Sequence, residues 1–249
     1  MSARSSRAAP PAAVDVFAEA LAEWLTSFTV PQELAAEMAS VCSAGAPWAA
    51  ALAGTSVKRA GWPEREALAW GIAIGALAGA LEAARRSLAA SEEPEIDPVA
   101  SGAETTAKGK PARTADGPAL PLLASDGLIA GAHEALSSLD PARLGRAFEA
   151  LADGFGDGGP WRYIDSGWPR PAWPAVVSCG LAPAAAEDPR GPWYDLAKAW
   201  HAAFGTPGPA ASGVTLDAHS AADPDTVELL EFAARAARSG QEERDEEGF

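Results

Sequence analysis

Cysteine and histidine, which often bind metals or take part in nucleophilic catalysis, number only two and three in this sequence and lie far apart. The two cysteines, Cys42 and Cys179, cannot form a disulfide framework or a four-cysteine zinc site. His133-Glu134 begins an HExxH-like pattern, but Ser137 stands where the second histidine would be needed. We interpret Cys179 as a small buried hydrophobe, because no histidine lies at a helpful distance along the chain. We expect His133 at a helix surface or at the edge of the core.

A long stretch rich in charged and small polar residues lies between positions 91 and 121. Large apolar side chains are almost absent there, so this stretch has little to bury, and we predict a long, partly mobile loop. Loops of this length within a domain are uncommon and are usually functional or disordered. Its charged side chains include Glu92, Glu93, Asp97, Lys108, Lys110 and Arg113.

Helical periodicity dominates on both sides of this loop. Near the N-terminus, Val14, Phe17 and Leu21 recur at three- and four-residue steps, which is typical of an amphipathic helix. No segment shows a convincing strand pattern, so we predict an all-α fold. The expected helices cover residues 14–28, 31–45, 48–55, 64–90, 122–138, 140–153, 172–186, 193–204 and 224–239, and in the sixth we expect Leu144, Phe148 and Leu151 to face inward.

The longest of these helices, residues 64–90, contains glycines at four-residue spacing. Gly71, Gly75 and Gly79 would lie on one face and leave a flat groove there. Each costs about 1 kcal/mol relative to alanine in a helix interior, so the groove needs a reason. We expect close packing of another helix backbone, with a binding groove as the alternative.

The remaining organisation is that of one helical domain over residues 14–240. We expect a flexible leader at residues 1–13 and an acidic tail at residues 241–249. Four tryptophans follow the helix at 140–153 in a Pro-rich stretch. They would either anchor irregular chain to the helical body or form a partner surface, since Trp is enriched in interface hot spots. These tryptophans are Trp161, Trp168, Trp173 and Trp193.

Composition limits the classes of partner. Hydrophobic residues make up 48% of the 249 residues, which excludes wholesale disorder. Lys and Arg total 19 against 34 Asp and Glu, a net charge of −15, so nucleic acid and anionic membranes are not expected partners. The longest apolar run, residues 67–81, is shorter than the roughly 20 residues of a membrane span. With no apolar stretch after the first residues, we expect a soluble, cytoplasmic protein.

Two linked motifs in the middle of the chain carry a family resemblance. Lys108-Gly109-Lys110-Pro111 is followed, after a dozen or so residues, by the sequence LASDGLI at residues 123–129. This pattern resembles the trans-isoprenyl diphosphate synthases, or polyprenyl synthetases, in which RRGKPT precedes LAGDGLL at matching spacing. The resemblance implies that family's helical bundle, here shortened at the C-terminus, and it is strongest over about residues 65–155.

The same resemblance shows what is missing. The family ionises an allylic diphosphate whose leaving group is neutralised by magnesium ions held on two DDxxD motifs. This chain contains no Asp-Asp dipeptide. The nearest substitute is Glu92, Glu93 and Asp97, which we interpret either as a surface acidic loop or as a variant magnesium site. Pro94 and Pro98 disfavour a regular helix that would present these carboxylates at fixed spacing.

The cations that would hold a diphosphate are also reduced. By the resemblance, Lys108 matches a diphosphate-binding arginine of the family, and Lys110 and Arg113 could add charge. All three could equally form a solvated basic patch. Arg85-Arg86 stands where an aspartate pair might be expected and has the wrong sign for binding magnesium.

The resemblance therefore predicts a catalytically degenerate member of the family. Such a chain would act as a non-catalytic or regulatory subunit, as a homodimer or in a heteromer with an active isoprenyl diphosphate synthase, and would need no cofactor. One alternative is an active prenyltransferase that uses Mg²⁺ at a divergent site. Another is a helical interaction or scaffold protein with no link to isoprenoids.

Overall fold

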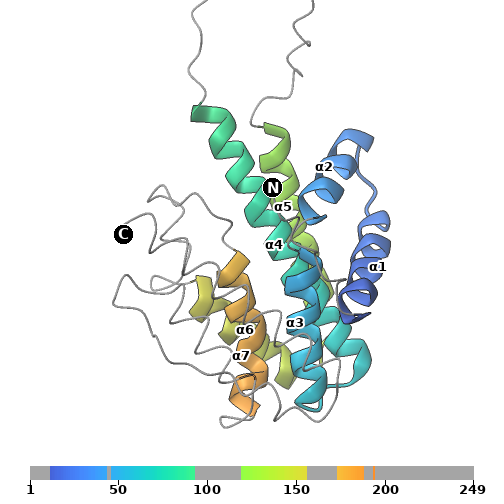
Figure 1. Ribbon diagram of the computed structural model, residues 1–249, viewed down its shortest axis with the longest axis vertical. Coiled ribbons are helices and arrows are strands. Elements are labelled where there is room, and N and C mark those ends of the chain that lie inside the picture. The colour runs from blue at the N-terminus through green and yellow to red at the C-terminus, as the bar shows by residue number, and fades with distance from the viewer. Residues whose placement is uncertain (1–11, 44–45, 93–118, 156–172, 188–192, 194–249) are drawn as a thin grey trace, which may run out of the picture.

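A long helix, α4 (Glu64–Glu92), runs through the middle of the bundle in the computed structural model (Figure 1). The structure describes residues 12–43, 46–92, 119–155, 173–187 and 193. Within these ranges the chain forms seven helices and no strands, so the protein is all-α there. The other six helices are α1 (Ala12–Thr26), α2 (Gln32–Cys42), α3 (Ala46–Arg59), α5 (Ala119–Leu136), α6 (Pro141–Phe155) and α7 (Trp173–Glu187).

Helix α4 is buried because it is apolar on nearly every side. It packs against α1, α2, α3, α5 and α7, and its Trp70 and Ile74 side chains are completely buried. By length and composition, Glu64–Leu88 could also cross a membrane, with a mean hydropathy of 1.6. However, 72% of that window is buried inside the protein, as in the core helix of a globular bundle.

The glycine face of α4 receives side chains from the first two helices. The ring of Phe17 on α1 lies between Gly54 of α3 and Gly71 of α4, and a β-carbon at either glycine would collide with it. Further along α4, a β-carbon at Gly79 would lie 2.5 Å from Cys42 Sγ on α2. The prediction of close packing on this face is therefore confirmed, and the packing partners belong to the same chain.

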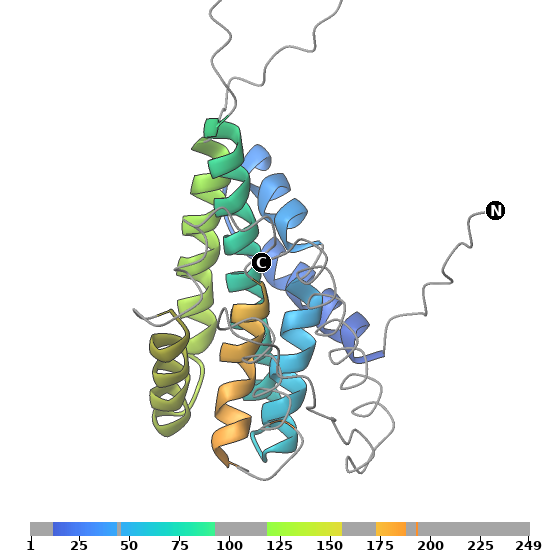
Figure 2. The ribbon, with the colours of Figure 1, turned by 60° about the vertical axis from the view of Figure 1, so that its left-hand side comes forward.

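Helix α5 uses small residues in the same way. It packs along α4 and against α2 (Figures 1 and 2). A β-carbon at Gly131 would lie 2.7 Å from Trp24 Cζ2 of α1, and Leu128 and Leu136 are fully buried beside it. Glycines on α3, α4 and α5 thus make room in the core for large side chains from the N-terminal part of the chain.

Helix α7 is fixed to the core by a buried hydrogen bond. Trp70 Nε1 on α4 donates to the Gly180 carbonyl oxygen at 2.9 Å. Around that contact α7 also packs on α3, where a β-carbon at Gly180 would lie 2.8 Å from Ala53 Cβ. Cys179 is buried, as expected from the sequence.

Most helix boundaries agree with the sequence predictions to within a few residues, but Phe148 does not face inward. Its side chain is 44% exposed, whereas Ala147 and Ala150 are buried and Leu144 and Leu151 are half-buried. The alanines allow α6 to approach the bundle more closely than a buried phenylalanine would. The buried face of α6 therefore contains Ala147 and Ala150, and not Phe148 as predicted.

Several sequence predictions fall outside the described residues. They are the leader before residue 12, most of the loop predicted at 91–121, the helix at 224–239, all of the helix at 193–204 except the buried Trp193, and the acidic tail. The side chains of Trp161, Trp168 and Trp173 also lie outside them.

Candidate functional site

The residues proposed for metal and diphosphate binding begin at the last residue of α4. Glu92 ends that helix, while Glu93, Asp97, Lys108, Lys110 and Arg113 lie outside the described residues. The helix extends two residues into the segment predicted as loop. Pro94 lies two residues beyond Glu92 in the sequence, and a proline disfavours the helical conformation of the residue before it, which agrees with a helix end at Glu92.

The loop prediction is also too long at its other end. Helix α5 begins at Ala119, and Pro121 falls within its first turn. A proline is tolerated there because the first N–H groups of a helix have no intrahelical acceptor.

The LASDGLI motif forms part of α5, and some of its side chains are buried while others are exposed. Ala124, Ser125 and Leu128 are buried, whereas Leu123 and Asp126 face solvent. A β-carbon at Gly127 would lie 3.6 Å from Met38 Cε on α2, an ordinary van der Waals distance. The motif's aspartate is thus on the surface of the pair formed by α4 and α5.

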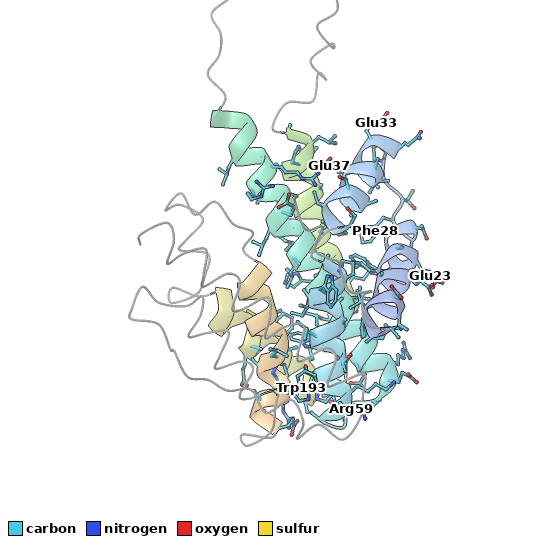
Figure 3. The ribbon with its side chains drawn as sticks, viewed as in Figure 1. Glu23, Phe28, Glu33, Glu37, Arg59 and Trp193 are labelled. Atoms are coloured by element: carbon cyan, nitrogen blue, oxygen red, sulfur yellow. The ribbon has the colours of Figure 1, made fainter. Side chains whose placement is uncertain are left out.

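The arginines near the end of α4 are held in ion pairs. Arg85 binds Glu82 through both carboxylate oxygens, with Nη2–Oε1 at 2.7 Å and Nε–Oε2 at 2.8 Å. Arg86 binds Glu82 at 3.1 Å, Glu37 of α2 at 3.3 Å and the Ser40 hydroxyl at 3.0 Å. Figure 3 labels Glu37 on α2. The network therefore fastens α2 to α4.

Hydrogen bonding within this network shifts both partners toward their charged forms. The bond from Arg85, aided by Arg86, lowers the pKa of the Glu82 carboxyl against the opposing effect of burial. The same bond raises the pKa of Arg85. At neutral pH this end of α4 therefore presents paired charges, and the carboxylate of Glu82 is already occupied.

A second polar cluster joins α6 to the beginning of α4. Arg143 Nη1 lies 3.1 and 3.2 Å from the two carboxylate oxygens of Glu66, and the Asp140 backbone N–H also donates to Glu66 at 3.2 Å. The Arg143 guanidinium stands 5.8 Å from the ring centroid of Trp62. Sequence reasoning missed this cluster because Glu66 and Arg143 are 77 positions apart, with no local pattern that links them.

The part of the chain that the structure describes contains no cluster of metal-binding side chains. No group of three or more His, Cys, Asp or Glu side chains there could hold a metal ion. His133 is exposed and its Nδ1 lies 2.7 Å from the Ile129 carbonyl oxygen, as a helix-surface histidine would be. Cys42 is buried, and desolvation raises the pKa of its thiol to about 12, which removes its nucleophilic form at neutral pH.

No protein-family model matches this sequence. A search of curated proteins also returns no match.

Proposed function

We propose that this chain is a non-catalytic helical protein similar to the polyprenyl synthetases, which acts as a subunit of an isoprenyl diphosphate synthase. The observation that carries the proposal is the order of its two longest helices. Helices α4 and α5 pack along each other, and the Lys108–Pro111 motif and the LASDGLI motif lie after the first and within the second. The resemblance would require this order of apolar helix, basic motif and helix.

The charges on α4 support the non-catalytic part of the proposal. Ionisation of an allylic diphosphate needs carboxylates that converge on magnesium and are free to bind it. Near the end of α4, Arg85 and Arg86 stand where the resemblance would place an aspartate pair, and they are bound to Glu82 and Glu37. A guanidinium pair would repel magnesium at that position.

The interior of the bundle supports the same conclusion. The glycine face of α4, which could have lined a substrate groove, is filled by Phe17 and Leu21 of α1 and by Cys42 of α2. Apolar burial on this scale gives the bundle a stable core. The described core thus serves packing, and binding of a partner would use other surfaces.

The first experiment tests for a partner and its activity. The tagged full-length chain is purified from its source cells, and co-purifying proteins are identified by mass spectrometry. A synthase obtained in this way is then assayed alone and with this chain, using radiolabelled isopentenyl diphosphate and an allylic diphosphate, and product lengths are separated by chromatography. We expect a change in rate or product length that saturates at a fixed ratio of the two chains.

The second experiment distinguishes the alternatives. The isolated chain is incubated with Mg²⁺ and allylic diphosphates, and release of diphosphate is measured. Release that is lost in Glu93→Ala would replace the proposal with an active prenyltransferase. Absence of both diphosphate release and any effect on a synthase would leave a scaffold protein and refute the subunit proposal.

A further inference from the structure

The end of α3 fixes Trp62 in a buried position. Gly61 has a φ of 92°, and the bonds Trp62 N–H to Val57 O, at 2.9 Å, and Gly61 N–H to Lys58 O, at 3.1 Å, form a Schellman motif. Trp62 is only 4% exposed and lies 6.3 Å from the ring of Trp70. Its indole Nε1 is buried without a hydrogen-bond acceptor among the described residues.

Arg143 closes over this tryptophan at the start of α6. Asp140 accepts hydrogen bonds from the N–H groups of Ala142 and Arg143, at 3.0 and 3.1 Å, which is the pattern of an N-terminal cap. The cap sets the direction of α6 and brings Arg143 to Glu66, whose side chain is only 15% exposed. The ion pair therefore lies partly out of water, next to the Trp62 ring.

Apart from this cluster, α6 has a small apolar contact with the rest of the described structure. It packs chiefly against α7 and lies at the edge of the bundle in Figure 2. Its buried side chains, Ala147 and Ala150, are small, and its larger ones, Leu144 and Leu151, are only half-buried against the core. Phe148 remains largely exposed beside His133. A second ion pair, Arg146 with Glu187, links it to α7.

We infer that α6 opens from the bundle as a separate unit, and that the ion pair between Arg143 and Glu66 is the latch that holds it closed. Elements with few buried apolar side chains open at lower free energy than a core helix such as α4. The closed position also leaves the Trp62 N–H without an acceptor, a penalty that water relieves on opening. The charged latch therefore decides how often α6 opens and uncovers Trp62.

The test is hydrogen exchange of the full-length chain, followed by mass spectrometry. In the unmodified protein, amides of α6 should exchange faster than those of Trp70 and Ile74 in α4. Glu66→Gln keeps the size of the side chain but removes its charge. It should speed exchange in α6 about tenfold, the change equivalent to about 1.4 kcal/mol, and leave α4 unchanged.

Two further variants make the result specific. Glu64→Gln is the matched control, because Glu64 lies in the same first turn of α4 but pairs with Lys58 on the surface. It should leave α6 exchange unchanged. Arg143→Gln removes the other partner and should reproduce the effect of Glu66→Gln, and the double variant should add little, since both changes break one interaction.

Three results would overturn the inference. Helix α6 could exchange as slowly as Trp70 and Ile74 in the unmodified chain. Both Glu66→Gln and Arg143→Gln could speed exchange equally in α6 and α4, which would show global destabilisation in place of local opening. The control Glu64→Gln could also speed α6 exchange as much as Glu66→Gln does.

Discussion

Replacing Gly71 by alanine tests how tightly α1, α3 and α4 meet. The new β-carbon would lie 2.8 Å from the Ala50 carbonyl oxygen and would collide with the Phe17 ring. The ring is already confined, because a β-carbon at Gly54 of α3 would collide with it as well. Overpacking typically costs about 1–3 kcal/mol, and the helix-propensity gain of alanine over glycine returns about 1 kcal/mol. Because a backbone atom stands in the way at 2.8 Å, the cost should fall in the upper part of that range, about 2–3 kcal/mol, which leaves a net destabilisation of about 1–2 kcal/mol.

The measurement is urea unfolding together with a thermal melt of the full-length chain. For a protein of this size the expected loss corresponds to a fall in Tm of about 2–8 °C. Gly145→Ala is the matched control: Gly145 is also inside a helix, but a β-carbon there would have no neighbour within 4 Å. It should stabilise the protein by about 0.5–1 kcal/mol through propensity alone.

A larger side chain at Gly75 should also destabilise the protein, because it would overpack the contact between α3 and α4. Gly75→Leu places its β-carbon 3.1 Å from Ala50 Cβ and 3.2 Å from the Ala46 carbonyl oxygen, so the rest of the leucine has no room. If Gly71→Ala and Gly75→Leu were both as stable as the parent, the packing of α4 against α1 and α3 described above would be refuted.

Three more outcomes are expected. Cys42 should resist alkylation at pH 8 in the folded protein and react once urea unfolds it, because burial raises the pKa of its thiol to about 12; rapid native labelling would contradict this. Glu82 has a lowered pKa from its bond to Arg85, so the stability it adds is present above its unfolded pKa of about 4.3 and is lost as pH falls through the lower folded value. The stability difference between the parent and Glu82→Gln, measured by urea unfolding, should therefore shrink in acid, and a constant difference would count against the ion pair. Magnesium with diphosphate should not raise Tm, although a ligand at 100 times its Kd would add about 2.7 kcal/mol; a rise lost in Glu93→Ala would indicate a metal site.

Helix positions were predictable because each helix has its own local pattern. Val14, Phe17 and Leu21 recur at helical spacing and all three are buried. The helix at residues 64–90 was recognisable by its length and apolar content, and it is the core helix α4. Such patterns depend on neighbours three or four positions away, which a sequence displays directly.

Contacts between distant segments were not predictable in the same way. The glycine spacing in α4 indicated a close neighbour, but nothing in the sequence identified Phe17 as the side chain that fills it. Spacing alone predicts that Phe148 faces inward, but the smaller Ala147 and Ala150 are buried in its stead, because they allow a closer approach of α6 to the bundle. The ion pair of Arg143 with Glu66 joins residues that are 77 positions apart, and no local pattern in the sequence links them.

The position of Phe17 between Gly54 and Gly71 has a consequence for the order of folding. The socket that receives the ring has one wall on α3 and one on α4, so it exists only after these two helices have paired. They are neighbours in sequence, joined by a short turn, and local pairs of this kind form early. Helix α1 is synthesised first, yet it should dock after them. In refolding kinetics, Phe17→Leu should therefore mainly speed unfolding and leave the folding rate nearly unchanged.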